Sequence, residues 1–155
     1  MEEKQIHTVV KIGTNVCRFV LAIVFIFSGF VKAVDPLGTM YKIEEYFEAW
    51  GLSSLVYSVV PFILSIALAL LEFCLGVYFL FGFRRRLSTS LALIFLSIMT
   101  LLTLWLAIVN PISDCGCFGE ALVLANWQTF WKNVILTLAA VVTFKWGNLI
   151  VPFVT

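Results

Sequence analysis

The stretch RRRLSTSLALIFLSIMTLLTLWLAIV, residues 84–109, decides the fold class of this chain. Three arginines are followed by 23 residues that carry no charged side chain. A helix needs about 20 mainly apolar residues to cross the hydrocarbon core of a bilayer, which is about 30 Å thick. Residues 87–109 are therefore predicted to form a membrane-spanning helix, which ends at Asn110-Pro111 because proline cannot continue it.

Three more apolar runs of similar length, residues 12–34, 59–83 and 127–149, accompany this one. Hydrophobic residues make up 62% of the 155-residue chain and charged residues only 12%, whereas soluble domains carry about 25% charged residues. The sequence therefore predicts an all-α integral membrane four-helix bundle, organised as a single domain over residues 1–155. The first run also has the charged flank of a signal peptide, but it is long for one, and we interpret it as a retained span.

A shorter amphipathic stretch, residues 40–52, lies between the first two spans. Apolar side chains recur there at helical spacing, with glutamates between them: Ile43, Tyr46, Phe47 and Trp50. This pattern predicts a short helix lying on the membrane surface in the first outer loop, with Gly51 as its stop.

Lysine and arginine predict the orientation, because cytoplasmic loops are enriched in them. They gather before the first span, at residues 84–86 and at Lys145, whereas the first loop is mostly acidic and the third has none before Lys132. We expect a multi-pass protein of the bacterial inner membrane with both termini cytoplasmic and the other two loops periplasmic. The formal net charge of +1 argues against a nucleic-acid partner.

The third loop carries the paired cysteines Cys115 and Cys117, separated by Gly116. Residues two apart can reach disulfide distance, glycine allows the bend, and the small ring would be strained. Strained, exposed disulfides are the labile or catalytic ones, which favours a redox-active pair. Reduced packing residues, a structural clip and a Cu(I) site remain alternatives, although the sequence offers no histidine or methionine beside the pair and we predict no metal ligands.

Two neighbours of the pair are candidates for its chemistry. Asp114 directly precedes Cys115 and is a candidate proton acceptor for a thiol, or a residue that caps the loop. Lys132, near the start of the last span, is a candidate stabiliser of thiolate, or an interfacial anchor. Asn133 adds a polar group near the same surface.

Intramembrane charge is the other signal in the sequence. Glu72 falls near the middle of the second span, where an ionised carboxylate must be paired, protonated or functional. Lys32, in the outer third of the first span, has a side chain long enough to pair with it. The alternative is a lysine that extends to the interface and a neutral buried glutamate.

These residues resemble the MauE/DoxX-like group of four-span membrane proteins, and more closely its MauE branch. The matching stretches are Ser28–Lys32 with Asp35-Pro36, Leu71-Glu72 with Gly76 and Gly82, Asp114–Gly119, and Trp127–Phe130 with Lys132-Asn133. In that group MauE is thought to help form or process the disulfide-rich small subunit of methylamine dehydrogenase, and relatives work beside thioredoxin-like proteins.

The resemblance thus implies a membrane thiol–disulfide oxidoreductase or assembly factor with a thioredoxin-like or disulfide-containing partner outside the membrane. Paired outer cysteines in a four-span bundle also look like vitamin K epoxide reductase and DsbB-type oxidoreductases, which makes a quinone the cofactor to consider. Here the single Cys-x-Cys pair argues against a full internal electron relay. Two alternatives stand: a non-enzymatic membrane subunit or chaperone that uses residues 40–52 as its contact, and a small-molecule or metal carrier that uses Glu72.

Overall fold

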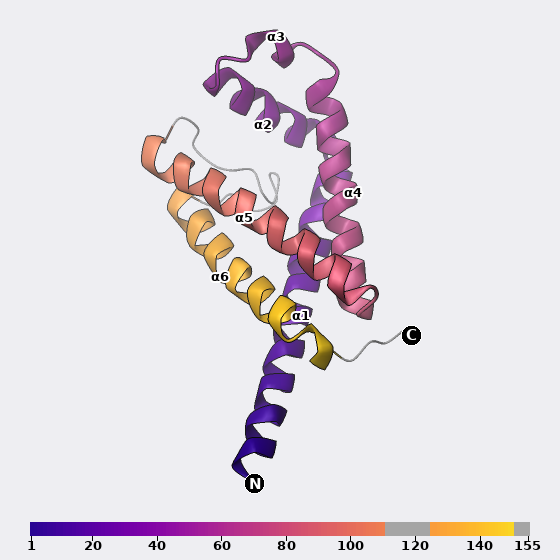
Figure 1. Cartoon of the computed structure of the whole chain (residues 1–155). Coiled ribbons are helices and arrows are strands. Elements are labelled where there is room, and N and C mark those ends of the chain that lie inside the picture. The colour runs from indigo at the N-terminus through magenta and orange to yellow at the C-terminus, as the bar shows by residue number, and fades with distance from the viewer. Residues whose placement is uncertain (111–124, 151–155) are drawn as a thin grey trace.

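A computed structural model describes residues 1–110 and 125–150, and within them every regular element is a helix (Figure 1). This confirms the predicted all-α class. The elements are α1 (Glu2–Val34), α2 (Pro36–Ala49), α3 (Ser53–Val56), α4 (Val60–Phe81), α5 (Arg85–Val109), α6 (Asn126–Lys145) and a 3₁₀ turn, η1 (Gly147–Leu149).

Three of the helices, α1, α4 and α5, are long and apolar enough to cross a membrane. Their outward side chains are large and apolar along much of their length, which only lipid can solvate at low cost. On α5, for example, the exposed positions include Leu87, Leu91, Ile94, Ile98, Leu101 and Ile108. The chain is therefore a helical membrane protein.

The fourth predicted span corresponds to α6, which is 20 residues long but is not among these three helices. Its first half carries Asn126, Gln128, Lys132 and Asn133, and these polar groups lower its mean hydropathy. That α6 crosses the membrane stays a prediction. The helix also ends at Lys145, four residues before the predicted boundary at residue 149, because the chain turns into η1.

The other boundaries follow local backbone signals. Helix α1 begins at Glu2, ten residues before the predicted span, because a helix continues beyond the apolar run. Gly82 directly follows α4, and Asn110 directly follows α5. Both residues have the left-handed conformation (φ 69° and 53°) that commonly terminates helices. The predicted ends at residues 83 and 109 are thus within two residues of those observed.

Helix α2 starts earlier than the predicted residue 40. Pro36 occupies its first turn, and the Asp35 carboxylate accepts a hydrogen bond from the Gly38 N–H at 2.9 Å. The pair Asp35-Pro36, directly after α1, therefore starts α2. Gly51, with φ at 73°, follows the last turn as predicted. The short helix α3 was not predicted.

The amphipathic face of α2 is turned toward its own chain. Ile43 and Tyr46 are buried, α2 packs against α4, and the Trp50 ring lies 6.0 Å from the Trp105 ring of α5. Half of Trp50 remains exposed. The face predicted to serve as a partner contact is therefore largely occupied within the chain.

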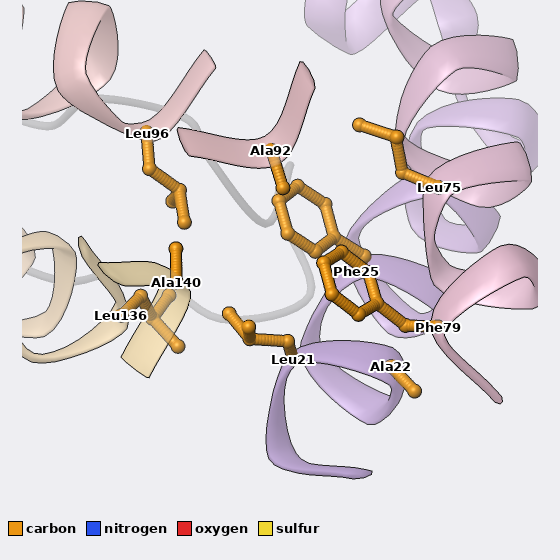
Figure 2. Close-up of a cluster of buried hydrophobic side chains, with 9 residues drawn as sticks. All are labelled: Leu21, Ala22, Phe25, Leu75, Phe79, Ala92, Leu96, Leu136 and Ala140. Atoms are coloured by element: carbon orange, nitrogen blue, oxygen red, sulfur yellow. The ribbon is translucent and has the colours of Figure 1, made fainter. Parts of the chain in front are cut away.

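The long helices form two closely packed pairs, α1 with α4 and α5 with α6 (Figure 1). A cluster of buried apolar side chains from all four helices joins the pairs (Figure 2). At its centre Phe25 stacks on Phe79 with ring centroids 6.2 Å apart and meets Phe95 at 5.9 Å. The remaining members are Leu21, Ala22, Leu75, Ala92, Leu96, Leu136 and Ala140.

Two glycines allow α1 and α4 to approach at backbone distance. A Cβ atom added to Gly29 would lie 2.5 Å from the Phe73 nitrogen, and one added to Gly76 would lie 2.6 Å from the Ile26 nitrogen. Backbone atoms cannot move aside as a flexible side chain can. Small residues at such interfaces let membrane helices pack closely without a hydrophobic driving force.

Replacing Gly29 with alanine is expected to separate α1 from α4 and to lower the free energy of unfolding by about 1–3 kcal/mol, the usual cost of overpacking. Gly13→Ala is the matched control, since its Cβ would meet nothing within 4 Å and alanine favours the helix. Reversible unfolding in detergent micelles measures both variants. Equal stabilities of the two variants would refute the close-packing account.

Candidate functional site

The two intramembrane charges predicted from the sequence form an ion pair. Lys32 Nζ on α1 lies 2.8 Å from Glu72 Oε2 on α4, and the two side chains are only 5% and 6% exposed. Ser28, one helical turn before Lys32, completes a triangle: its Oγ accepts a hydrogen bond from Lys32 Nζ at 2.7 Å and donates one to Glu72 Oε2 at 2.8 Å. The Lys32 side chain thus points to Glu72 and does not extend to the membrane interface.

Local sequence explains why the triangle forms. Positions 28 and 32 are four apart, so both side chains project from one face of α1. Gly29 lies beside them and brings α1 onto the backbone of Phe73, the neighbour of Glu72. Desolvating two charges costs several kcal/mol per ion, which is recovered only with good geometry and extra hydrogen bonds. The serine hydroxyl supplies such bonds, and the centre is formed by Ser28, Lys32 and Glu72.

An apolar cavity of about 240 Å³ lies against this polar centre, bounded by α1, α2, α4 and α5. Lys32 and Glu72 are part of its wall, and the other lining side chains are mostly apolar or aromatic, among them Tyr46, Phe47, Trp50, Leu68, Phe95 and Leu102. An apolar pocket with a few convergent polar groups is the usual form of a small-molecule site. The cavity exceeds the roughly 150 Å³ known to hold benzene in a protein interior.

On the other side of the centre, α6 approaches it through a second cavity of about 30 Å³. Ser28, Glu72, Lys132 and Asn133 all contribute to its walls. The half-buried Lys132 is thus directed to the same region as the buried pair. This volume has room for one or two water molecules and nothing larger.

Asn133 does not bind the ion pair directly. Its Nδ2 donates to Thr103 Oγ1 at 3.3 Å and to the Met99 carbonyl at 3.4 Å, both on α5. With the Thr100–Thr137 hydroxyl bond of 2.9 Å, it fastens α6 to α5 along their buried face. The structure therefore gives Asn133 a role in packing as well as a place beside the centre.

Residues Asp114, Cys115 and Cys117 lie outside the described residues, and both flanks of their segment are described. Asn126 is the first residue of α6, and its Nδ2 donates to Asn110 Oδ1 at 2.9 Å and to the Leu106 carbonyl at 3.3 Å. The bond to Asn110 therefore joins described residues on the two sides of segment 111–124. The helix start is capped by Gln128, whose Oε1 accepts from the Ala125 N–H.

Ser28 and Gly29 belong to the candidate site, but neither residue was predicted to have a role there. The available signal was the spacing of Ser28 and Lys32 on one helical face, with a glycine beside them. No spacing in the sequence indicates the cavity, because its walls come from four helices that meet only in the fold.

The sequence model of a protein family described as methylamine utilisation protein MauE matches residues 10–145 of this chain. The match includes α1 from its third turn onward, the polar centre and the whole of α6. No curated protein and no solved structure matches the chain.

Glu72→Gln is expected to lower the free energy of unfolding by about 3–5 kcal/mol, because Lys32 would remain buried without its counter-charge. The double variant Lys32→Met, Glu72→Leu is expected to lose clearly less free energy of unfolding, since it buries no charge. Exposed Glu48→Gln is the control and should change stability by less than about 0.5 kcal/mol. Unfolding in detergent micelles reports all three values. A single variant as stable as the control would contradict a buried ion pair.

Proposed function

Because the chain belongs to the MauE family of methylamine utilisation proteins, we propose that it acts in thiol–disulfide exchange at the membrane, as an oxidoreductase or a disulfide-related assembly factor. Cys115 and Cys117 are the reactive pair. The partner is a thioredoxin-like or disulfide-containing protein on the outer side of the membrane. The observation that carries the proposal is the Cys-Gly-Cys stretch in a segment whose two flanks are joined by the Asn110–Asn126 bond.

The bond between the two flanks of the cysteine-bearing segment supports thiol–disulfide exchange with a partner protein. The Asn110–Asn126 bond holds the two flanks together, and the end of α5 also contacts α2 through Trp105 and Trp50. A reactive segment on a rigid base presents its sulfurs to a partner at low entropic cost. The proposed site combines this base with the lysine-bearing face of α6.

The proposed exchange consists of two successive thiol–disulfide displacement steps. A partner thiolate attacks the Cys115–Cys117 disulfide, forms a mixed disulfide with one cysteine and releases the other as thiolate. A second partner thiolate then displaces the bound cysteine, so that the partner gains a disulfide and the pair is reduced by two electrons. In the proposal Asp114 accepts a thiol proton. Lys132, six residues or about 9 Å along α6 from its start, stabilises thiolate.

A second candidate function is the binding of a small lipid-soluble molecule, and the 240 Å³ cavity favours it. Its aromatic walls suit a flat ring, and Lys32 supplies a hydrogen-bond donor. A quinone has this chemistry and takes up two electrons and two protons, which is what reoxidation of the cysteine pair would require. If the protein instead carries a small molecule, binding in this cavity would not require the cysteines.

Cys117→Ser and Cys115→Ser, each in a background with Cys17→Ser and Cys74→Ser, test the exchange. One of the two is expected to accumulate a mixed disulfide with a partner, seen as a reducible adduct on non-reducing gels of intact membranes, because its resolving thiol is missing. The double variant Cys115→Ser, Cys117→Ser is the control and should form none. Complete absence of adducts, together with full complementation by the double variant, would exclude the redox role.

Leu102→Phe tests the cavity, since it adds a ring to the lining without a charge. We expect it to weaken binding of a short-chain ubiquinone analogue at least about tenfold by steric exclusion. Leu101→Phe, on the exposed face of the same helix, is the control. Binding is measured by fluorescence quenching of the tryptophans in micelles. Equal affinity in both variants, or none in the parent protein, would refute a quinone-sized ligand at this place.

A further inference from the structure

Four cationic side chains surround a hollow of about 810 Å³ at the end of the bundle where α4 passes into α5 and α6 ends (Figure 1). Arg84, Arg85 and Arg86 come from the α4–α5 turn and the start of α5, and Lys145 comes from the last turn of α6. Residues about 60 positions apart in sequence thus converge on one space. None of the described lining residues is acidic.

One of the four, Arg85, forms the wall of the hollow. Its guanidinium donates to the carbonyls of Gly147, Asn148 and Ile150 at 3.2, 3.3 and 3.0 Å. These bonds satisfy carbonyls beyond the end of α6 and hold the η1 turn against α5. The backbone that frames the hollow is therefore fixed by an interaction across the bundle.

The other three cations are exposed, and two of them lie close to aromatic rings. Arg84 lies with its guanidinium 5.9 Å from the Phe83 ring centroid, and Lys145 Nζ lies 4.9 Å from that of Trp146. The ion pairs within the described part of the chain, Lys32–Glu72 and Lys42–Glu45, involve none of them. These three positive charges can therefore bind an anion that does not belong to the described part of the chain.

The position of the hollow indicates which kind of anion would bind there. Two membrane-spanning helices, α4 and α5, end and begin there, so the cations lie where the apolar layer gives way to headgroups. Leu87 and Phe144, both about half exposed, also line the hollow. A phosphate joined to an acyl chain matches a cationic space with an apolar side, and basic pockets between spans are known to bind such headgroups.

We propose that this hollow binds an anionic phospholipid, with the headgroup phosphate held by Arg84, Arg86 and Lys145 and an acyl chain lying along Leu87 and Phe144. A cluster that served only to orient the chain in the membrane would attract anions diffusely, without dependence on these particular side chains. The site is independent of the cysteine pair and of the 240 Å³ cavity.

Native mass spectrometry of the full chain, titrated in micelles with phosphatidylglycerol or phosphatidylcholine, tests the site. The parent protein should bind one phosphatidylglycerol at least about tenfold more tightly than phosphatidylcholine. The double variant Arg84→Gln, Arg86→Gln should lose most of this preference, and adding Lys145→Gln should remove the rest. The matched control is Lys4→Gln, Lys11→Gln, which removes two exposed cations of α1 outside the hollow and should keep the preference.

Three results would overturn the proposal: equal binding of the two lipids by the parent protein, an equal loss in both double variants, or full displacement of phosphatidylglycerol by millimolar inorganic phosphate. The last would identify a site for free phosphate. Because Arg85 is kept in every variant, the frame of the hollow is retained, and an unchanged thermal unfolding midpoint checks that each variant is folded.

Discussion

The structure depends on one ion pair placed where lipid and apolar side chains surround it. Lys32 and Glu72 can be charged there only if α1 and α4 come close enough for a 2.8 Å contact and if a hydroxyl satisfies both partners. Ser28 supplies the hydroxyl, and Gly29 and Gly76 supply the approach. The ion pair and the glycines thus impose one requirement on both helices: a backbone contact at a fixed register.

The other elements are arranged around this contact. The aromatic rings of Phe25, Phe79 and Phe95 join the α1–α4 pair to α5. Helix α6 is held on α5 by polar bonds and brings Lys132 to the small cavity beside Glu72. Helix α2 covers the opposite side and leaves the 240 Å³ cavity between its aromatic face and the ion pair. A buried polar centre with space on two sides is the arrangement that a ligand or a proton-accepting site would need.

Composition and helical period predicted the all-α membrane class, and they placed α4 and α5 to within two residues, because span length is set by the bilayer. The pairing of Lys32 with Glu72 was one of two interpretations, since charge cost alone does not choose a partner. The Asn110–Asn126 bond and the packing of α2 on Trp105 were not predicted, because the fold alone brings these partners together. The roles of Asp114, Cys115 and Cys117 rest on the sequence and the family, and stay predictions.

A charge swap tests the central interaction most directly. Lys32→Glu and Glu72→Lys would each bury two like charges, whereas the combined variant restores an attractive pair across the same contact. The free energy of unfolding in micelles should therefore fall severely in each single variant, and the swap should recover at least about 2 kcal/mol relative to either, within the usual range of coupling energies. A swap no more stable than the single variants would show that the two residues act separately, and the account of α1–α4 packing given above would be wrong.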